Sequence, residues 1–516
     1  MELFDSFSGT DGFSLLAGLP NLANLTLYEC SGLTDLSSLA GIAGLTKLNL
    51  QFCSGFGDLS PLAALKNLSN LFIYGCEGVE DFSPLAGLAN LSDLTIFYYN
   101  KLTDIRPLAG LKGLTSLDLT GCTALTDLSP LAGLTSLSKL KLASCQELTD
   151  LRPLAGLTCL TELDFSECAE LQDISPLKNL TGLVRLNLSD CYELTDISAL
   201  AKLSNLTDLD LSLCPNLPPV LPPLPELKNL CLLNLSFCSQ ITDISSLSDL
   251  TALSELYLES LSSLTDISPL SKLTDLEDLG LSGCSSLTDL KPLADLSNLR
   301  YLNLGESDDS GCSSLKDLSP LSGLKALQNL ELAQASSLAD LSPLAGLTNL
   351  LWLQLSSCPN LTDLSPLKQM TKLSQLDLAG CIFITGLSPL EKLKSLEHLD
   401  LCGCPNISDL APLGHLKNLK NLGLSGCRSL SDLAPLGKLT GLFNLDLAGC
   451  PGLSDLTPLG KMTGLTSLDL SGCPGLSDLS PLGKLKNLRS LDLTGCGLAD
   501  IASLRHLPNF DKFKFD

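Results

Sequence analysis

Residues 114–134 read LTSLDLTGCTALTDLSPLAGL, and this stretch decides the fold of the chain. Residues 137–157 read LSKLKLASCQELTDLRPLAGL, and residues 160–180 read LTELDFSECAELQDISPLKNL. The cysteine of each stretch follows the previous one by 23 residues, and this period recurs through almost all of the 516 residues. A fixed period of this length indicates stacked turns that share one core, so we predict a solenoid of about 21 to 22 turns.

Each turn is predicted to contain one short strand and one bend. In the segment LxxLxL, apolar and polar residues alternate, so the leucines point into the core and the residues between them point outward. Successive strands would then pair as a parallel sheet. The Ser-Pro pair further along favours a 3₁₀ helix, because proline is tolerated at the first helical position and serine can cap it. We therefore expect an α/β solenoid whose second side is mostly 3₁₀, turn or extended.

Eighteen of the 21 cysteines occupy the same place in their turns, which we call the ladder position. Tyr99, Leu261 and Ala335 replace the cysteine in three turns. Stacking would place neighbouring sulfurs roughly 5 Å apart. We interpret them as free, buried thiols, since interior cysteine behaves as a small hydrophobe, and this favours a reducing compartment. The ladder cysteines are residues 30, 53, 76, 122, 145, 168, 191, 214, 238, 284, 312, 358, 381, 404, 427, 450, 473 and 496.

A column of eighteen aspartates lies two residues before the position of that serine in each turn. The simplest role of these side chains is to accept backbone N–H groups in the bend. The alternative is a column of cation sites, but Gly386 replaces the aspartate in one turn. The column comprises residues 35, 58, 81, 104, 127, 150, 173, 196, 243, 266, 289, 317, 340, 363, 409, 432, 455 and 478.

Composition narrows the class of partner and the compartment. The formal net charge of −25 argues against nucleic acid and anionic membranes, because no basic face exists to neutralise phosphates. The sequence contains no apolar run of 18 residues, so no membrane span is predicted. Residues 1–12 lack the pattern of a secretory signal. We expect a cytoplasmic monomer, or a secreted or surface protein if a signal peptide has been removed. Nine N-x-S/T sequons would favour secretion, but most follow from the repeated N-L-T/S text.

The period is broken at a few places within the predicted single solenoid, residues 1–516. The Pro-rich turn is expected to be extended on its outer side, because proline fixes φ and lacks an N–H group. The acidic insertion is expected to form a loop. The irregular segments are a degenerate first turn (1–29), the Pro-rich turn (215–230), the insertion (305–311) and a closing turn (497–516) with Phe510, Phe513 and Phe515.

The repeated sequence motif resembles the repeats of known protein families. LxxLxLxxCxxL is similar to the strand half of cysteine-containing leucine-rich repeats, and TDLSPLAGL resembles the second half of the internalin-type bacterial repeats. Leucine-rich-repeat proteins of trypanosomatids look similar too. The text departs from internalins in its 23-residue period and in having cysteine instead of asparagine at the ladder position. The resemblance implies a horseshoe with a parallel sheet on its concave face, and binding of proteins through that face.

Candidate binding residues lie on the outward strand positions, six, four and two residues before the ladder position. Four aromatic residues cluster there in the first turns, and exposed aromatic clusters often mark binding hot spots. The alternative is packing beneath a cap or a neighbouring domain. The later aspartates either keep the sheet soluble or attract basic residues of a partner. The candidates are Tyr28, Phe72, Tyr74, Phe97, Tyr257, Tyr301, Trp352, Asp377, Asp400, Asp446, Asp469 and Asp492.

Catalytic chemistry is not indicated by the sequence. His398, Asp400 and Cys402 share one strand face, but His398 and Cys402 would stand roughly 13 Å apart, beyond hydrogen-bond reach. No zinc-ligand spacing and no phosphate-binding loop are found, so we predict no metal and no cofactor. The sequence predicts a non-enzymatic scaffold that binds a basic protein or peptide. The alternatives are a recognition segment of a larger ligase or receptor, and a secreted internalin-like adhesin.

Overall fold

The structure is a computed structural model of the chain, and it describes residues 2–3, 19, 21–305, 312, 314–498 and 501–515. The chain divides into two compact units, Met1–Leu253 (unit 1) and Ser254–Asp516 (unit 2). The single solenoid over residues 1–516 stays a prediction. Most of the predicted first turn (1–29) and all of the acidic insertion except Gly305 lie outside the described residues.

Unit 1 is a parallel sheet to which each turn contributes one strand. Leu117 pairs with Leu140, and Leu140 pairs with Leu163, so the register advances by one full repeat from strand to strand. The strands are β1 (Glu2–Leu3), β2 (Asn24–Tyr28), β3 (Lys47–Gln51), β4 (Asn70–Tyr74), β5 (Asp93–Phe97), β6 (Ser116–Asp118), β7 (Lys139–Lys141), β8 (Glu162–Asp164), β9 (Arg185–Asn187), β10 (Asp208–Asp210) and β11 (Leu232–Asn234).

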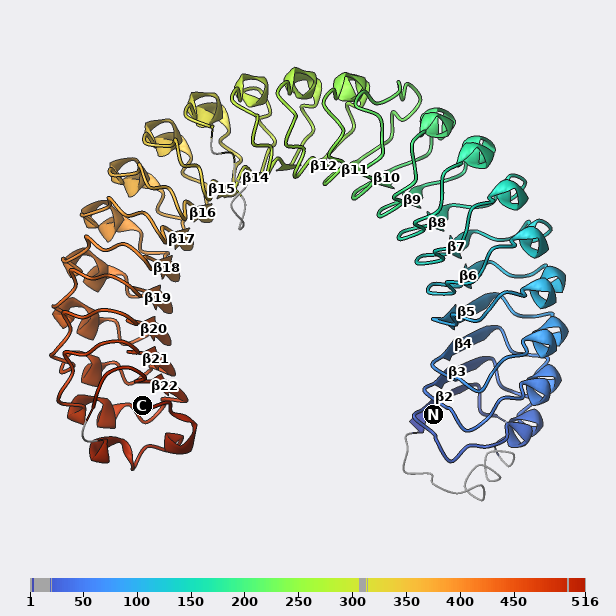
Figure 1. The fold of residues 1–516 in the computed structure, drawn as a ribbon, viewed down its shortest axis with the longest axis horizontal. Helices are drawn as coiled ribbons and strands as arrows, with labels where there is room; N and C mark the ends of the chain where they lie inside the picture. Colours follow the sequence, from blue (N-terminus) through green and yellow to red (C-terminus); the bar gives the residue numbers. More distant parts are fainter. Residues whose placement is uncertain are drawn as a thin grey trace. The chain divides into compact units, whose positions relative to one another are not determined.

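The other side of unit 1 carries 3₁₀ helices. Within this unit the strands line the inner side of the curve and the helices line the outer side (Figure 1). The helices are η2 (Ser37–Gly41), η3 (Ser60–Ala64), η4 (Ser83–Gly87), η5 (Arg106–Gly110), η6 (Ser129–Leu131), η7 (Arg152–Leu154), η8 (Ser175–Asn179), η9 (Ser198–Lys202) and η10 (Ser245–Asp249).

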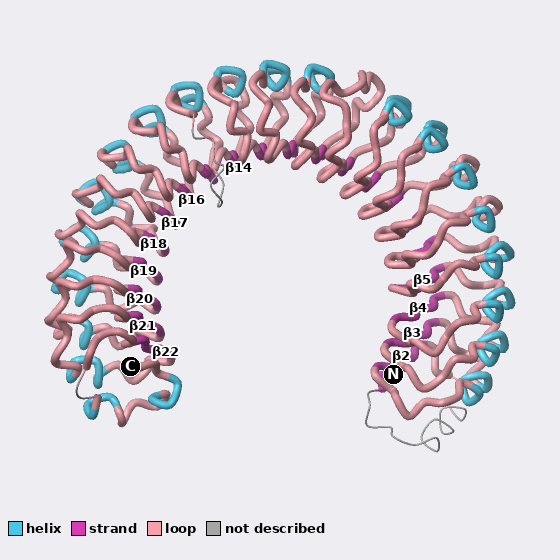
Figure 2. The backbone as a smooth tube through the Cα atoms, viewed as in Figure 1, coloured by secondary structure: helices cyan, strands magenta, loops and turns pink. Residues whose placement is uncertain are grey.

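Unit 2 repeats the same plan, with its strands and helices on opposite sides (Figure 2). The strands are β12 (Glu255–Tyr257), β13 (Asp278–Gly280), β14 (Tyr301–Asn303), β15 (Asn329–Glu331), β16 (Trp352–Gln354), β17 (Gln375–Asp377), β18 (His398–Asp400), β19 (Asn421–Gly423), β20 (Asn444–Asp446), β21 (Ser467–Asp469) and β22 (Ser490–Asp492). The helices are η11 (Ser268–Lys272), η12 (Lys291–Leu293), η13 (Ser319–Gly323), η14 (Ser342–Gly346), η15 (Ser365–Gln369), η16 (Ser388–Lys392), η17 (Ala411–His415), η18 (Ala434–Lys438), η19 (Leu459–Lys461), η20 (Ser480–Lys484), η21 (Ala502–Leu504) and η22 (Phe510–Lys512).

The core of each unit is filled by the repeated leucines. In a representative turn Leu114 and Leu119 are fully buried, while Ser116 and Asp118 between them are half-buried. The same alternation recurs in the other strands, and every described helix is a 3₁₀ helix. The predicted fold class, a parallel sheet backed by 3₁₀ segments, is confirmed for both units.

The ladder cysteines form a column of buried thiols. From Cys53 onward the ladder thiols reach back to the previous turn: Cys145 Sγ donates to the carbonyl of Leu119 at 3.5 Å, and Cys168 Sγ to that of Leu142 at 3.2 Å. Burial raises the pKa of Cys145 to about 12, so the thiol stays protonated and unreactive. Tyr99, at the ladder position of its turn, also reaches the previous turn, but its hydroxyl donates to a different carbonyl, that of Cys76, at 2.8 Å.

The column of aspartates before the 3₁₀ helices stabilises the bends, as predicted. Asp127 Oδ1 accepts the backbone N–H of Ser129 at 2.8 Å, and the equivalent bond recurs along the column, as at Asp363 and Asp432. The serine itself does not cap the helix, because the residue at the N-cap is the preceding leucine and makes no side-chain hydrogen bond. The aspartate therefore supplies the acceptor that we expected of the serine.

Two of the irregular segments are described. Residues 211–231, which contain the Pro-rich turn, include no helix, and Val220 there pairs with Asp243 in a single parallel bridge. At the other end of the chain, Lys514 pairs with Asp492 on β22. Phe513 is buried, and Phe510 lies 6.2 Å from it and 5.4 Å from Phe515 between ring centroids.

Candidate partner-binding surface

The four predicted aromatic residues of unit 1 come together on neighbouring strands. Tyr74 and Phe97 are paired in register on β4 and β5, with ring centroids 6.3 Å apart. Phe72 lies 5.7 Å from Phe97. Tyr28, on β2, reaches this group only through Phe52, whose ring lies 5.6 Å from Tyr28 and 4.6 Å from Tyr74.

Phe52 and Tyr98 are binding candidates that the sequence analysis missed, because it considered only the positions six, four and two residues before the ladder position. Both sit immediately before the ladder position, at what we call the corner position, where the strand ends. Their side chains are 39% and 62% exposed, and Tyr98 stacks on Phe97 at 5.9 Å. We define the aromatic patch as Tyr28, Phe52, Phe72, Tyr74, Phe97 and Tyr98.

The backbone at the corner position is left-handed, which only glycine adopts without strain. Phe52 has φ = 53° and Tyr98 has φ = 57°. Glycine precedes cysteine in the sequence at Gly75 and Gly121, so a signal for this conformation was present in the repeat text. The rings of Phe52 and Tyr98 lie over these two glycines, because a Cβ at Gly75 or Gly121 would come within 2.7 or 2.3 Å of them.

A hollow of about 560 Å³ opens beside Tyr98. Its floor includes the buried Val79, Phe82 and Leu102, and Glu77 and Lys101 stand at its lining. A hollow with an apolar floor beside exposed rings suits an apolar anchor residue of a partner.

The charged residues further along the strand face of unit 1 neutralise one another. Lys139 lies 3.0 Å from Glu162, and Arg185 lies 2.9 Å from Glu162 and 3.7 Å from Asp208. Glu162, Arg185 and Asp208 border a hollow of about 290 Å³. Two carboxylates of this region, Glu162 and Asp208, are therefore neutralised by cations of the same strand face.

In unit 2, Tyr257 and Tyr301 belong to an acidic group instead of an aromatic one. Tyr257 Oη lies 3.2 Å from both Glu255 and Asp278, and Tyr301 Oη donates to Glu331. Burial, with the neighbouring glutamates, raises the pKa of Asp278 to about 6 although Tyr257 donates to it. Asp278 Oδ1 is buried and has no hydrogen-bond partner among the described residues.

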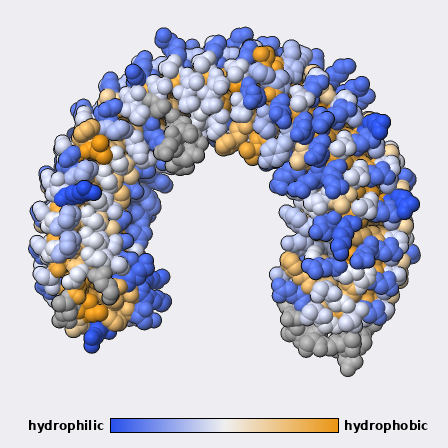
Figure 3. All heavy atoms as spheres, viewed as in Figure 1, coloured by the Kyte–Doolittle hydropathy of each residue, from blue (hydrophilic) through white to orange (hydrophobic). Residues whose placement is uncertain are grey.

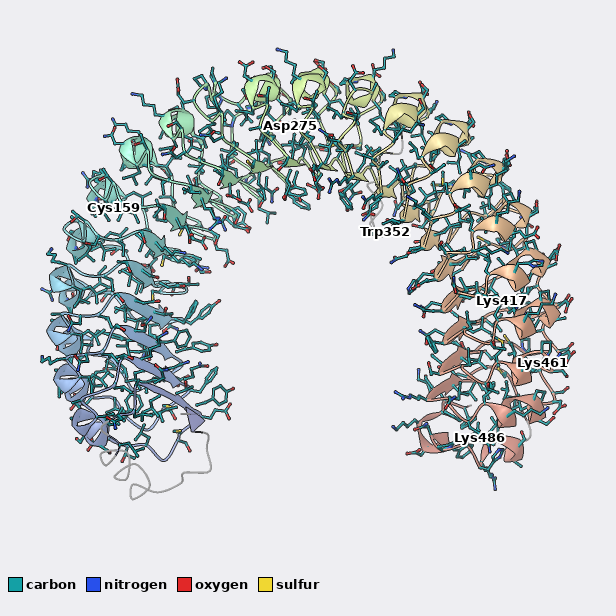
Figure 4. All side chains as sticks on the ribbon, turned by 180° about the vertical axis from the view of Figure 1, so that it is seen from behind. Cys159, Asp275, Trp352, Lys417, Lys461 and Lys486 are labelled. Carbon is teal, nitrogen blue, oxygen red and sulfur yellow. The ribbon has the colours of Figure 1, made fainter. Side chains whose placement is uncertain are left out.

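Trp352 and three of the predicted aspartates border a separate hollow of about 400 Å³ in unit 2. Trp352 lies on the strand side, away from the 3₁₀ helices (Figure 4). Asp377, Asp400 and Asp446 are half-buried, and each uses one carboxylate oxygen to accept the backbone N–H two residues further on, at 2.8 to 2.9 Å. These aspartates therefore have a structural role that the sequence did not indicate.

The last two predicted aspartates differ from these three. Asp469 pairs in register with Asp446 and lies outside the lining of the hollow. Asp492 is ion-paired with Lys514 at 3.1 Å. Burial alone would raise the pKa of Asp492, but hydrogen bonds from Thr494 and Lys514 outweigh it and lower that pKa. Asp492 is thus already neutralised within the chain.

The geometry around His398 and Cys402 does not favour nucleophilic chemistry. His398 Nδ1 lies 2.9 Å from the side-chain amide of Asn421, and Cys402 Sγ lies 3.9 Å from Asp446 Oδ2. Burial and the neighbouring Asp400 raise the pKa of Cys402, which disfavours a thiolate. Within the described part of the chain, no group of three or more histidines, cysteines and carboxylates is arranged to hold a metal.

The outer surface is mixed in character. On the face seen in Figure 3, hydrophilic residues cover most of each unit and apolar residues form scattered small groups. None of the helices in the described ranges is long and apolar enough to cross a membrane.

Comparisons with known proteins bear on the fold. A family model described as leucine-rich repeats (2 copies) matches residues 89–133 and 463–506. No curated protein matches the chain.

Among solved structures, a leucine-rich-repeat protein of Leptospira interrogans is 21% identical, with a TM-score of 0.52 over 84% of this chain and 97% of that chain. A complex of TLR13 with ssRNA13 is 19% identical, with a TM-score of 0.53 over 96% and 91%. An internalin of Listeria monocytogenes is 24% identical, with a TM-score of 0.41 over 75% and 89%. At these identities the first two likenesses bear on the fold alone.

Proposed function

We propose, from the premise that this chain is a leucine-rich repeat protein, that it is a non-enzymatic scaffold which binds a protein partner on its strand face. Proteins of this kind are generally binding scaffolds. Because a preformed sheet loses little conformational freedom on binding, it presents contact residues at low entropic cost.

The observation that carries the proposal is the pair of exposed rings at Phe52 and Tyr98. Each is held in a left-handed backbone conformation that costs about 1 kcal/mol for an L-residue. Strain of this kind tends to persist at functional sites, where the side chain is needed. Their rings extend the strand-face aromatics to the corner of the sheet, and together they form one surface beside a hollow with an apolar floor.

The chemistry of the partner follows from the two kinds of surface. The aromatic patch favours an apolar or aromatic segment, and the unpaired aspartates of unit 2 favour basic residues. A partner made of nucleic acid is disfavoured by the net charge of −25, although one similar fold is seen in complex with RNA. The chain then acts either alone or as the recognition segment of a larger protein.

The proposal is tested by affinity capture from an extract of the source cells, followed by binding measurements with the purified partner. The decisive variant is Phe52→Gly with Tyr98→Gly, which removes both rings and gives the corner position the residue that it prefers. We expect the affinity for the partner to fall at least about thirtyfold, because two hot-spot rings are lost. The thermal stability should change little, since relief of strain offsets the lost ring contacts.

The matched control is Ser144→Gly, which changes a polar corner residue of the same conformation (φ = 57°) outside the patch. The control should bind the partner as the wild type does. Equal binding by the double variant would move the site away from the aromatic patch. A captured RNA instead of a protein would replace the proposed class of partner.

A further inference from the structure

The hollow beside Trp352 is bordered by five strands of one sheet, β16 to β20, all within unit 2. Its lining includes Gly423 on β19, which has no side chain. Gly423 stands in register between Asp400 on one side and Asp446 on the other. The row of outward side chains is therefore interrupted at this strand, and two carboxylates flank the gap.

The side chains around Gly423 turn toward this gap. Asp400 Oδ1 lies 2.5 Å, and Cys402 Sγ 2.8 Å, from the point that a Cβ of residue 423 would occupy. From the opposite side, Asp446 Oδ2 lies 3.9 Å from the same sulfur. Any larger residue at position 423 would displace Asp400 or Cys402. We call this feature the Gly423 hollow.

The charge of the hollow is not neutralised by a cation of the described residues. Within that part of the chain no lysine or arginine lines it, and the nearby Lys420 is paired with Glu397 at 2.7 Å. Burial and nearby carboxylates raise the pKa of both Asp377 and Asp446. This contrasts with β7 to β10 of unit 1, where Lys139 and Arg185 neutralise Glu162 and Asp208.

One end of the hollow is an aromatic wall. Trp352 is in register with Gln375 on the next strand and with His398 on the strand after it. The backbones of Trp352 and His398 are therefore roughly 10 Å apart. Aromatic rings attract cations, and arginine stacks on them while its planar fork bonds to carboxylates. The half-buried carboxylates of Asp400 and Asp446 are complementary in charge to a guanidinium, while the indole, at least two strands away, can contact the peptide that carries it.

Resting on the proposed binding function, we propose that the Gly423 hollow receives an arginine side chain of the protein partner. The guanidinium lies over Gly423 and donates to the carboxylates of Asp400 and Asp446. The aliphatic stem of the arginine and the peptide that carries it lie along His398 toward Trp352. The oxygens that cap the backbone stay in place, and the guanidinium replaces the Cys402 thiol as the donor to Asp446 Oδ2.

The test uses Trp352, the only tryptophan of the chain, as an intrinsic fluorescent reporter. The full chain is titrated with three capped pentapeptides, Gly-Ser-X-Ser-Gly, in which X is arginine, citrulline or lysine. We expect a saturable change in Trp352 fluorescence with the arginine peptide. The citrulline peptide should bind at least about tenfold more weakly, because it keeps the shape but loses the charge of the guanidinium. The lysine peptide should bind more weakly as well, since a point charge cannot bridge two carboxylates.

The decisive variant is Asp400→Asn, which should weaken binding of the arginine peptide at least about fivefold. It is expected to fold, because Asn187, Asn234 and Asn303 make the same backbone-capping bond elsewhere at 3.0 Å. The control is Asp432→Asn, which makes the same change of charge at a capping position before η18.

Three results would overturn the inference: equal binding of the citrulline or lysine peptide, undiminished binding by the Asp400→Asn variant, or an equal loss in the Asp432→Asn control. Failure of the inference is distinguishable from failure of the proposed function. The peptides probe unit 2 alone, whereas the Phe52→Gly and Tyr98→Gly variant reports on capture of the natural partner by unit 1.

Discussion

The corner position shows how the two units use one backbone conformation differently. In unit 1 it holds exposed apolar side chains at Phe52, Tyr98, Leu213 and Phe237, which are 39%, 62%, 38% and 48% exposed. In unit 2 the corner position is glycine in every turn from Gly380 to Gly495, with φ between 63° and 75°. Because the backbone is the same, the apolar corners of unit 1 are not required by the fold. Polar corner residues such as Ser144 have the same backbone conformation, so the apolar corners are distinguished by the rings and side chains that they expose.

The strand faces differ in the opposite sense. Unit 1 carries aromatic rings and then charges that pair within the sheet, as Arg185 does with Glu162 at 2.9 Å. Unit 2 carries carboxylates such as Asp377 and Asp400 in a hollow that no lysine or arginine of the described residues lines. The repeat therefore determines the backbone and the buried residues of both units. The two units differ at the few exposed positions that the repeat leaves variable.

The largest effect is expected from mutating two neighbouring leucines of unit 1, one in the core and one at a corner position. Leu211 is 1% exposed in the core, and Leu213 is 38% exposed at a corner with φ = 57°. We expect Leu211→Ala to lower the free energy of unfolding by about 3 kcal/mol, because it leaves a cavity. Leu213→Gly should keep the free energy of unfolding within about 1 kcal/mol of the wild type, because relief of strain offsets the lost contacts.

Urea denaturation followed by circular dichroism measures both variants, with hydrogen exchange over residues 205–240 as a local readout. A loss of about 3 kcal/mol on Leu213→Gly would show that the exposed corner side chain belongs to the core. The strain argument for Phe52 and Tyr98 would then fail as well.

A smaller effect is expected from the reverse change in unit 2. Gly426 has φ = +70°, and a Cβ there would meet nothing closer than 3.6 Å. Gly426→Ala therefore isolates the cost of a left-handed backbone and should destabilise the unit by about 1 kcal/mol.

The matched control is Gly441→Ala, at a glycine whose φ is not left-handed and whose Cβ would meet the Lys417 carbonyl at 3.5 Å. This variant should be neutral or slightly stabilising, since alanine restricts the unfolded chain. Faster hydrogen exchange around Gly426 in the first variant and not in the second is the expected outcome. Equal behaviour would mean that the glycine corners carry no conformational requirement.

The frame was predictable from the sequence because each turn repeats the same text. The spacing of leucines in a stretch such as residues 114–134 predicted the strands, the buried face and the ladder. The bond from Asp127 to Ser129 followed from turn chemistry, although the serine was wrongly expected to cap the helix. Repetition makes local sequence rules reliable, because the same rule is applied to the same motif in every turn.

The candidate site was predictable only in part. The outward-position rule placed Tyr74 and Phe97 in one group, but it passed over Tyr98, because the rule considered only strand positions. The pairing of Asp492 with Lys514 depends on where the last residues return to the sheet, which no repeat encodes. The capping bond of Asp400 depends on backbone geometry at the strand end. Such contacts follow from three-dimensional placement and not from spacing.

The smallest expected effect concerns the unpaired acids of unit 2 and their response to pH. Burial raises the pKa of Asp278 to about 6, above its value near 3.8 in the unfolded chain. The folded state therefore binds more protons than the unfolded state between these values. Linkage then requires that the stabilising contribution is complete below about pH 4 and is lost as the pH rises through 6.

The groups that face Asp278 act in the same direction. Glu255 and Glu259 are carboxylates, Tyr257 donates to Asp278, and Glu331 has a pKa raised by burial. The Asp columns that cap the 3₁₀ helices act oppositely, but only at lower pH. Asp104, for example, has its pKa lowered to about 2 by the hydrogen bonds from Arg106, so its contribution is lost only below pH 4.

We therefore expect unit 2 to gain stability when the pH falls from 7.5 to 5, and Asp278→Asn to remove part of this gain. The difference should be below about 1 kcal/mol, because Asp278 is half-exposed and solvent screens its charge. Urea denaturation at pH 5 and 7.5 measures it, with Asp208→Asn in the charge-paired region of unit 1 as the control. If the Asp278→Asn variant keeps the full pH dependence of the wild type, the acidic group of unit 2 is neutralised in solution. The contrast between paired and unpaired strand faces would then rest on Asp400 and its neighbours alone.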